Sequence, residues 1–228
     1  MNIYLSPAKV LNLKQPSNQP LKIAFNQQTT HLYTISKSFS TAQLQTELQI
    51  SEKLATTVYE YYQQPVKSYE PLQLFNGDAF KAFDFDSLQP SEQQRAKQHI
   101  LIGDAFYGLI RGTDRIAPYR LDFTKTFNEM NLYHYWQDLV QSHLEKPLID
   151  LSSMEYQRLL PSYLDHPQIR LDLIKGSSIL RKRFRGLAAR AIIQQQISSI
   201  NELNKLEIPG FEFVDETRTH RYYQVVID

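Results

Sequence analysis

The sequence contains no cysteine and only three methionines among its 228 residues. Without cysteine the chain cannot form a disulfide, a thiolate zinc site, a cysteine-ligated iron–sulfur cluster or a thiol nucleophile. The methionines, at positions 1, 130 and 154, are too few and too scattered for a methionine-based scavenger or a soft-metal site. We therefore do not expect redox chemistry on sulfur.

Long hydrophobic runs and metal-ligand patterns are also missing. No apolar segment approaches the roughly 20 residues that a membrane helix needs, and residues 1–7 lack the basic and apolar segments of a secretory signal. The six histidines show no ligand spacing, such as two on one helix face with a glutamate. We therefore expect a cytoplasmic protein with no membrane partner, no metal site and no cofactor.

Basic and acidic residues nearly balance over the whole chain, but basic residues are concentrated in one segment. The net charge is +1, so any affinity for nucleic acid has to come from a local patch rather than from the whole molecule. The segment 175–190 contains no acidic residue. Its basic residues are Lys175, Arg181, Lys182, Arg183, Arg185 and Arg190.

The apolar content, 42% hydrophobic and 12% aromatic residues, is enough for a sizeable core. Strands are predicted at residues 2–5, 72–75, 119–123, 148–151, 169–174, 211–214 and 222–227. Helices are predicted after Ser40 and Ser51 and at residues 91–106, 132–144 and 178–197, with mostly loop at residues 12–38. There is no internal repeat and no regular strand–helix alternation. The sequence predicts an α+β fold, a single domain over residues 1–228 with a mixed sheet flanked by helices.

Five short polar motifs fall where predicted strands or helices end. They are Ser6-Pro7-Ala8-Lys9, Asn76-Gly77-Asp78, Tyr107-Gly108-Leu109-Ile110-Arg111, Pro118-Tyr119-Arg120-Leu121 and Arg185-Gly186-Leu187. The ends of elements are where folds present side chains and backbone amides to ligands. Together the motifs predict one composite site.

Each of the first two motifs has a functional and an architectural interpretation. Ser6 and Lys9 can bind an anion through a hydroxyl and an ammonium group, or Lys9 can be a surface lysine after a strand end. Asp78 can belong to an ordinary turn, or it can orient a base or ribose hydroxyl or transfer a proton.

The arginine motifs also have a functional and an architectural interpretation. Arg111 and Arg120 are forked donors that suit phosphate, and Tyr107 or Tyr119 can stack on a base. The spacing of the residues is equally compatible with structural ion pairs from Arg111 to Asp114 and from Arg120 to Asp122. In the predicted helix at residues 178–197, Arg183, Arg190 and roughly Gly186 fall at helical spacing and can share a face, and the basic residues form either a phosphate-binding stripe or a solvated face. Gly186 in mid-helix costs about 1 kcal/mol relative to alanine, which indicates close approach of another backbone or of a ligand.

In their residues and their order along the chain, these motifs resemble those of the YaaA family (DUF328 or UPF0246), bacterial proteins linked to peroxide stress. The resemblance extends from Met1 to near Asp228. The family carries S-P-A-K, G-D, an L-Y-G-x-L-R-P-x-D block followed by P-Y-R-L-E, and A-K-x-A-R-G. This chain departs at Phe106, Gly112 and Asp122. The resemblance implies a YaaA-like fold with a basic cleft and a role for Ser6, Lys9 and Arg120 in binding.

Family members are also described as containing a helix-hairpin-helix DNA-binding element. The nearest segment here is residues 100–114, with glycines at 103, 108 and 112, but it does not match the hairpin pattern of two glycines around one apolar residue.

Two functional hypotheses follow. The first is a stress protein that binds duplex, bulged or single-stranded DNA through a basic cleft and limits iron-dependent oxidative damage. Its predicted binding residues are Ser6, Lys9, Arg111, Arg120, Arg183, Arg185 and Arg190. The second is an enzyme, or a former enzyme, acting on a nucleotide, base or phosphorylated small molecule, with Lys9, Asp78 and Tyr107 as catalytic candidates. A third interpretation makes the motifs architectural ion pairs.

Overall fold

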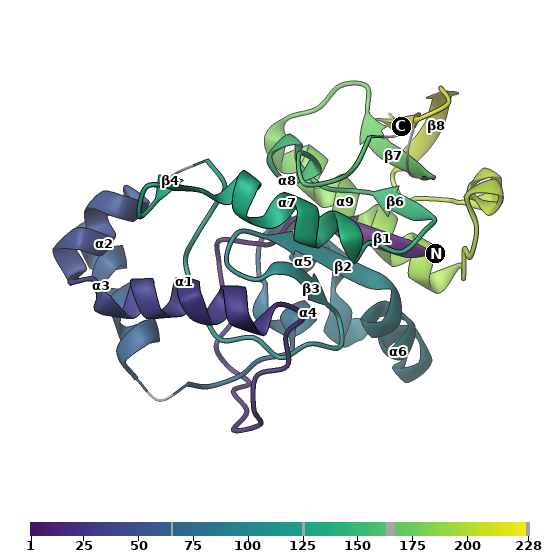
Figure 1. Ribbon diagram of the computed structural model, residues 1–228. Coiled ribbons are helices and arrows are strands. Elements are labelled where there is room, and N and C mark those ends of the chain that lie inside the picture. Colours follow the sequence, from purple (N-terminus) through teal and green to yellow (C-terminus); the bar gives the residue numbers. More distant parts are fainter. Residues whose placement is uncertain (65, 125, 163–166, 227–228) are drawn as a thin grey trace.

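A seven-stranded mixed sheet runs through the molecule in the order β3-β2-β1-β6-β7-β9-β8 (Figure 1). The computed structural model describes residues 1–64, 66–124, 126–162 and 167–226. The strands are β1 Asn2–Leu5, β2 Ile100–Asp104, β3 Gly108–Arg111, β6 Leu148–Asp150, β7 Gln168–Leu173, β8 Phe211–Glu216 and β9 His220–Val225. The five central strands are parallel, and β3 and β8 are antiparallel edge strands. The α+β prediction with a mixed sheet is confirmed.

The order in which strands are added to the sheet reverses at β1. Strands β2 and β3 are added on one side of β1, and β6 and β7 are then added on its other side. The carboxyl ends of β1 and β6 therefore flank a topological switch point, which is where open α/β sheets commonly bind ligands. We call this region the carboxyl edge; it comprises the ends of β1 and β6 and the loops that follow them.

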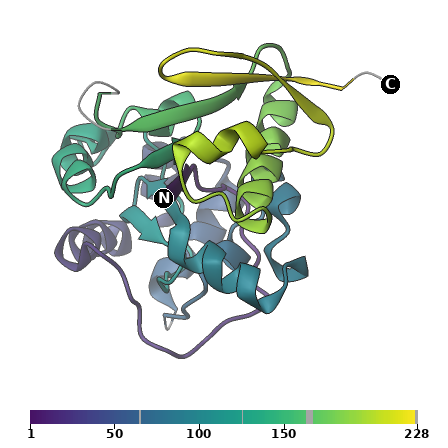
Figure 2. The same ribbon diagram turned by 90° about the vertical axis from the view of Figure 1, so that its right-hand side faces the viewer.

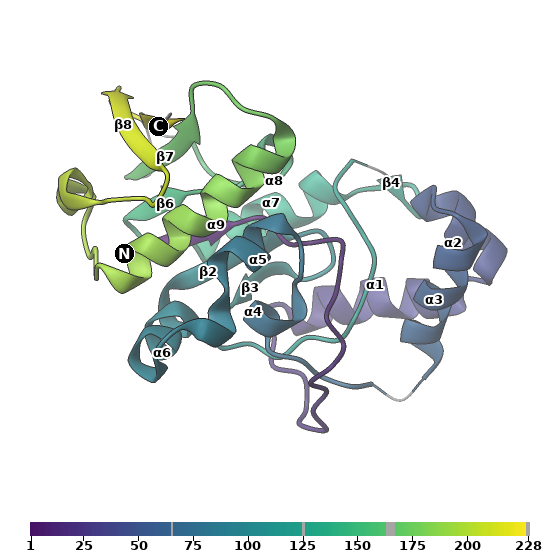
Figure 3. The same ribbon diagram turned by 180° about the vertical axis from the view of Figure 1, so that it is seen from behind.

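Helices cover both faces of the sheet. They are α1 Asn26–Ser38, α2 Thr41–Leu48, α3 Glu52–Gln63, α4 Pro71–Leu74, α5 Asp78–Phe83, α6 Pro90–His99, α7 Leu132–Ser142, α8 Met154–Gln157 and α9 Ser178–Gln194. Figure 1 shows α7 in front of the sheet, and Figure 3 shows α9 and α5 side by side on the other face. Short 3-10 helices lie at Phe85–Ser87 and Ile200–Lys205, and a small hairpin joins β4 Thr126–Phe127 to β5 Met130–Asn131. The β8–β9 hairpin lies at one end of the sheet (Figure 2).

The core explains why these segments form these elements. Ile3, Tyr4 and Ile149 on the central strands are fully buried, as is Trp136 on α7. The indole nitrogen of Trp136 donates a 2.8 Å hydrogen bond to the carbonyl oxygen of Ala105, so its one polar atom is satisfied inside the core. The predicted helix caps at Ser40 and Ser51 are confirmed, since each side chain accepts a backbone hydrogen bond.

Three predicted elements were wrong. The predicted helix over residues 91–106 ends at His99, and the apolar run that follows forms the central strand β2, buried on both faces. Residues 72–74 belong to the short helix α4 rather than to a strand, because Pro71 occupies the first helical position, and Phe75 follows as its C-cap. Residues 119–123 form no strand; they lie in a loop that ends in a turn at Phe123.

Two further expectations are corrected. The segment predicted as loop contains α1, whose buried positions Thr29, Leu32 and Ser36 recur at helical spacing in an otherwise polar sequence. The segment nearest to a helix-hairpin-helix element, residues 100–114, is the antiparallel β2–β3 hairpin, in which Gly108 has a φ of 71°. The DNA-binding element implied for this segment is therefore not formed there.

Candidate functional site

The first two polar motifs lie side by side at the carboxyl edge. The backbone N–H of Asn76 donates to the carbonyl oxygen of Val10 at 2.9 Å. A Cβ added to Gly77 would lie 2.9 Å from the Cβ of Ala8, so only glycine fits here without displacing the neighbouring loop. Asp78, half-buried, follows as the first residue of α5.

The loop after β6 completes this edge. The Oγ of Ser6 accepts a 2.8 Å hydrogen bond from the backbone N–H of Ser153, and the two hydroxyl groups are 3.2 Å apart. The loops at the switch point are therefore joined through side chains as well as through the sheet.

Arg120 and Asp122 both contact the Ser6–Lys9 loop. Arg120 donates from Nη1 to the carbonyl oxygen of Lys9 at 3.1 Å. The Nζ of Lys9 lies 2.8 Å from Oδ2 of Asp122, whose other oxygen accepts a 2.5 Å hydrogen bond from Thr124. Asp122 thus pairs with Lys9, and the Lys9 side chain remains 55% exposed.

Glu155, on α8, is a member of this cluster that the sequence motifs did not identify. Its Oε1 accepts a 3.0 Å hydrogen bond from the backbone N–H of Phe123, the neighbour of Asp122. Burial raises the pKa of Glu155, the Phe123 hydrogen bond opposes this, and the negative charge of Asp122 adds to the rise. Burial acts in the same direction on Asp122, but the hydrogen bonds from Lys9 and Thr124 outweigh it, and the pKa of Asp122 is lowered.

Helix α9 packs on α5 through a close backbone contact at Gly186. A Cβ there would overlap the backbone of Ala79 and come within 2.9 Å of the backbone nitrogen of Phe83. The predicted close approach is thus to another backbone. One turn further along, Nη1 of Arg190 donates to the carbonyl oxygens of Phe83 and Asp84, each at 2.8 Å, which satisfies carbonyl groups at the end of α5.

Arg183 lies one turn before Gly186 on the same face of α9. Helix α9 packs against α5, which begins with Asp78. Arg183 is exposed. Lys9, Asp78 and Arg183, predicted from three distant parts of the chain, thus belong to neighbouring segments.

Arg185 lies beside a second buried charge network. Nη1 of Arg170 is 2.6 Å from Oδ2 of Asp150. The carboxylate of Asp172 forms ion pairs with Arg170 at 3.3 Å and with Arg181 at 2.6 Å. The Nε of Arg185 is buried and has no hydrogen-bond partner among the described residues. Burial lowers the pKa of Arg185, against the opposing charge of Asp172.

A third cluster surrounds Asp104 at the end of β2. The carboxylate accepts hydrogen bonds from the backbone N–H groups of Phe106 and Tyr107 and from the hydroxyl of Tyr119. Burial raises the pKa of Asp104 to about 6, against these hydrogen bonds. The hydroxyl of Tyr107 is buried as well and exchanges two 3.0 Å hydrogen bonds with the backbone of Ala117.

Arg111 lies apart from the carboxyl edge. It pairs with Leu101 near the start of β2, and its Nη1 lies 3.2 Å from Oε1 of Glu145. Its backbone N–H donates to Asp114 at 2.8 Å. The structure therefore brings Ser6, Lys9, Asp78 and Arg120 together and separates them from Arg111. The roles of these residues in binding stay predictions.

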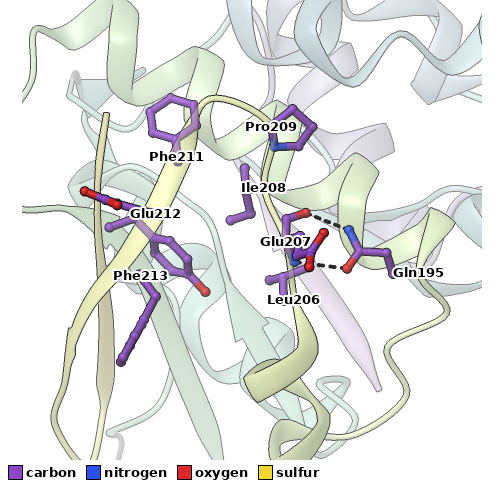
Figure 4. A pocket seen from close by; sticks show the side chains of 9 residues that line it. Gln195, Leu206, Glu207, Ile208, Pro209, Phe211, Glu212 and Phe213 are labelled. Carbon is purple, nitrogen blue, oxygen red and sulfur yellow. Dashed lines mark hydrogen bonds between the residues drawn. The ribbon is translucent and has the colours of Figure 1, made fainter. Parts of the chain in front are cut away.

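A pocket with a volume of about 500 Å³ lies between the β8–β9 hairpin and the segment after the second 3-10 helix (Figure 4). None of the motif residues lines it. Gln195 closes one side through two hydrogen bonds with the backbone of Glu207, at 2.6 and 3.0 Å. Most of the other lining residues are apolar, including Leu206, Ile208 and Phe211.

The described residues contain neither a metal-binding cluster of acidic and histidine side chains nor a membrane-spanning helix. Within the ranges that the structure describes, no group of three or more histidine, aspartate or glutamate side chains is arranged to hold a metal ion. None of the helices in those ranges has both the length and the apolar character that a membrane span requires.

The fold and this edge define an α+β protein with a polar cluster at the switch point of a mixed sheet. The model of the family "Peroxide stress protein YaaA" matches residues 1–217. A UPF0246 protein of Finegoldia magna is 28% identical over 230 residues, covering 95% of this chain and 93% of that protein. UPF0246 proteins of Shewanella sp. W3-18-1 and Francisella philomiragia are each 30% identical, covering 96% and 93% of this chain and 96% and 94% of their own lengths. The chain belongs to the YaaA family of peroxide stress proteins, and the resemblance drawn from the motifs is confirmed.

Proposed function

We propose that this YaaA-family protein acts in the cytoplasm by associating with DNA through cations at the carboxyl edge, and that this association limits iron-dependent oxidative damage. Lys9, Arg120, Arg183 and Arg185 bind the phosphates. Covering phosphate groups keeps iron from the DNA backbone, which needs no metal site in the protein.

The observation that carries this proposal is that two basic residues from distant segments meet at the carboxyl edge. The Lys9 side chain is 55% exposed, and Arg120 donates a hydrogen bond to the backbone carbonyl oxygen of Lys9. Arg183 is also exposed, on α9, and the segment 175–190 contains no acidic residue. Such a cluster suits a chain of phosphates, which binds by charge and releases counterions.

The test is binding of the purified protein to short duplex, bulged and single-stranded DNA at two salt concentrations. We expect affinity to fall as salt rises, and Arg183→Ala and Lys9→Ala to weaken binding and reduce the salt dependence. Arg111→Ala is the matched control, since Arg111 lies apart from the carboxyl edge. Equal weakening by Arg111→Ala, or no salt-dependent binding to any of the three DNAs, would contradict the proposal.

A second candidate is an enzyme acting on a nucleotide or phosphorylated small molecule at the same edge. The observation that favours it is the pairing of an exposed ammonium with a partly buried carboxylate at the switch point, where Lys9 meets Asp122. A surface that binds only phosphates needs no such carboxylate.

A further inference from the structure

Strand β8 leaves one edge of the main sheet open. It is the last strand in the sheet order, and among the described residues only β9 forms a ladder with it. The backbone N–H of Val226 donates to the carbonyl oxygen of Gly210, so the alternation of an antiparallel ladder directs the backbone groups of Glu212 inward, to β9. The N–H and carbonyl groups of Phe213 therefore face outward. Unpaired backbone groups of this kind are a template for a further strand.

The pocket beside the β8–β9 hairpin opens at this edge. The N–H of Phe211 donates to the carbonyl oxygen of Ile208 at 3.0 Å, and beyond this turn the segment 206–209 and β8 diverge (Figure 4). The volume of about 500 Å³ lies between them. Residues of β8 thus form one wall of the pocket, and side chains on one face of an added strand would enter it.

Both walls of the pocket are held in place by the fold. The ring of Phe211 packs against Phe184 of α9, with ring centres 5.1 Å apart, and the ring of Phe213 packs against Tyr223 at 6.0 Å. On the other side Gln195 holds the backbone of Glu207 through two hydrogen bonds. Even so, Phe213 is 47% exposed. A preformed pocket with an exposed aromatic side chain at its rim suits a large apolar side chain of a partner.

Charge narrows the kind of partner further. Glu207 and Glu212 line the pocket, and none of its nine lining residues is basic. Asp215 is exposed further along β8, whereas Glu216 is paired with Arg221 at 3.1 Å. A partner with lysine or arginine beside its apolar residues complements these acids. A second copy of β8 would bring the same acids to the edge, where like charges repel.

We propose that β8 binds an extended segment of a partner protein in which large apolar residues alternate with lysine or arginine. The segment adds a strand to the sheet through the outward backbone groups of Phe213. Its apolar side chains fill the pocket, and its basic side chains lie on the opposite face, the face of β8 that carries Glu212. None of the residues of the carboxyl edge lines this pocket, so the proposal does not rest on DNA association.

The test follows the fluorescence anisotropy of a labelled peptide, Lys-Val-Lys-Phe-Lys-Val-Lys with both ends capped, as the full chain is added. We expect saturable binding, and binding weaker by about tenfold or more when glutamate replaces every lysine.

Methylation of alternate backbone nitrogens of the peptide separates strand addition from simple charge attraction. One pattern removes the N–H groups that face β8, and the other removes those that face away. We expect one pattern to weaken binding by about tenfold, the net worth of one or two backbone hydrogen bonds, and the other to have little effect.

Two double variants test the role of the acids. Glu207→Gln with Glu212→Gln should weaken peptide binding and reduce its dependence on salt. Glu52→Gln with Glu60→Gln is the matched control, because it makes the same change of charge at exposed positions of α3, at the other end of the molecule (Figure 1). DNA binding by the first double variant should be unchanged, which separates this surface from the carboxyl edge.

Three results would overturn the proposal directly: no binding of the lysine peptide, equal binding of the glutamate peptide, or equal effects of the two methylation patterns. Light scattering provides a further check on the occupant of the edge. A dimer of the free protein that Phe213→Ala dissociates would assign the edge to a second copy of this chain and would also overturn the proposal.

Discussion

Gly186 of α9 and Ala79 of α5 are in backbone contact, with no room for a side chain between them. This contact places α9, the helix that carries Arg183, against α5, which begins with Asp78. The position of the cationic helix therefore depends on one glycine.

The first prediction concerns this glycine. Gly186→Ala would gain about 1 kcal/mol of helix propensity if the site were open. Because the added methyl group meets the Ala79 backbone, we expect a net loss of about 1–3 kcal/mol in the free energy of unfolding. Urea unfolding measures it, with Lys182→Ala on the exposed face of α9 as the control. A stabilised Gly186→Ala protein would contradict the packing.

The second prediction separates an architectural from a binding role for Arg190. Its guanidinium satisfies two carbonyl groups at the end of α5. Arg190→Met should therefore lower the free energy of unfolding by about 1–3 kcal/mol while the folded protein keeps its DNA affinity. A large loss of affinity at unchanged stability would assign Arg190 to the binding surface instead.

The third prediction tests Tyr107, a catalytic candidate from the sequence. Tyr107→Phe removes the hydroxyl that bonds to both backbone groups of Ala117, and leaves them buried and unpaired. We expect a loss of about 1–3 kcal/mol in unfolding free energy and no change in DNA affinity at temperatures where the variant is folded. Loss of DNA affinity with unchanged stability would give Tyr107 a role in binding instead.

The sequence predicted the family and most strands because these depend on local patterns. Residues 2–5, 148–151 and 169–174 were placed correctly from short apolar runs bounded by turn residues. The error at β2 arose because Ile100-Leu101-Ile102 directly follows a helix without a turn residue between them. A buried strand and a buried helix segment give the same short apolar run, so only the sheet decides between them.

The composite site was predicted in part for a related reason. Ser6, Lys9, Asp78 and Arg120 lie in recognisable motifs, and each motif does reach the carboxyl edge. Glu155 lies in no motif that was singled out, and its link to Phe123 exists only after folding. Asp104 and Asp150 carried a signal that could have been used, since each ends a buried strand. Arg111 shares a motif with Tyr107 but lies at the other end of β3.

The fourth prediction is a pH dependence of stability caused by Asp104. Burial raises the pKa of its carboxyl group to about 6 in the folded protein, from 3.8 in a peptide. Between these values the folded state binds more protons than the unfolded state, so stability falls as pH rises from about 4 to about 6. The expected loss from this group is about 2–3 kcal/mol.

Asp114, whose pKa burial also raises to about 6, acts in the same pH range. Urea unfolding at several pH values measures the slope, and Asp104→Asn should make it shallower without removing it. A stability that rises across this range, or a slope that Asp104→Asn does not change, would contradict the assignment.

The most direct measurement of the central claim is amide hydrogen exchange of the protein with and without short single-stranded DNA. We expect slower exchange in residues 6–10, 76–79 and the first turns of α9, and unchanged exchange around Arg111 and Glu145. Protection confined to the end of the sheet that carries Arg111, with none at the carboxyl edge, would contradict it.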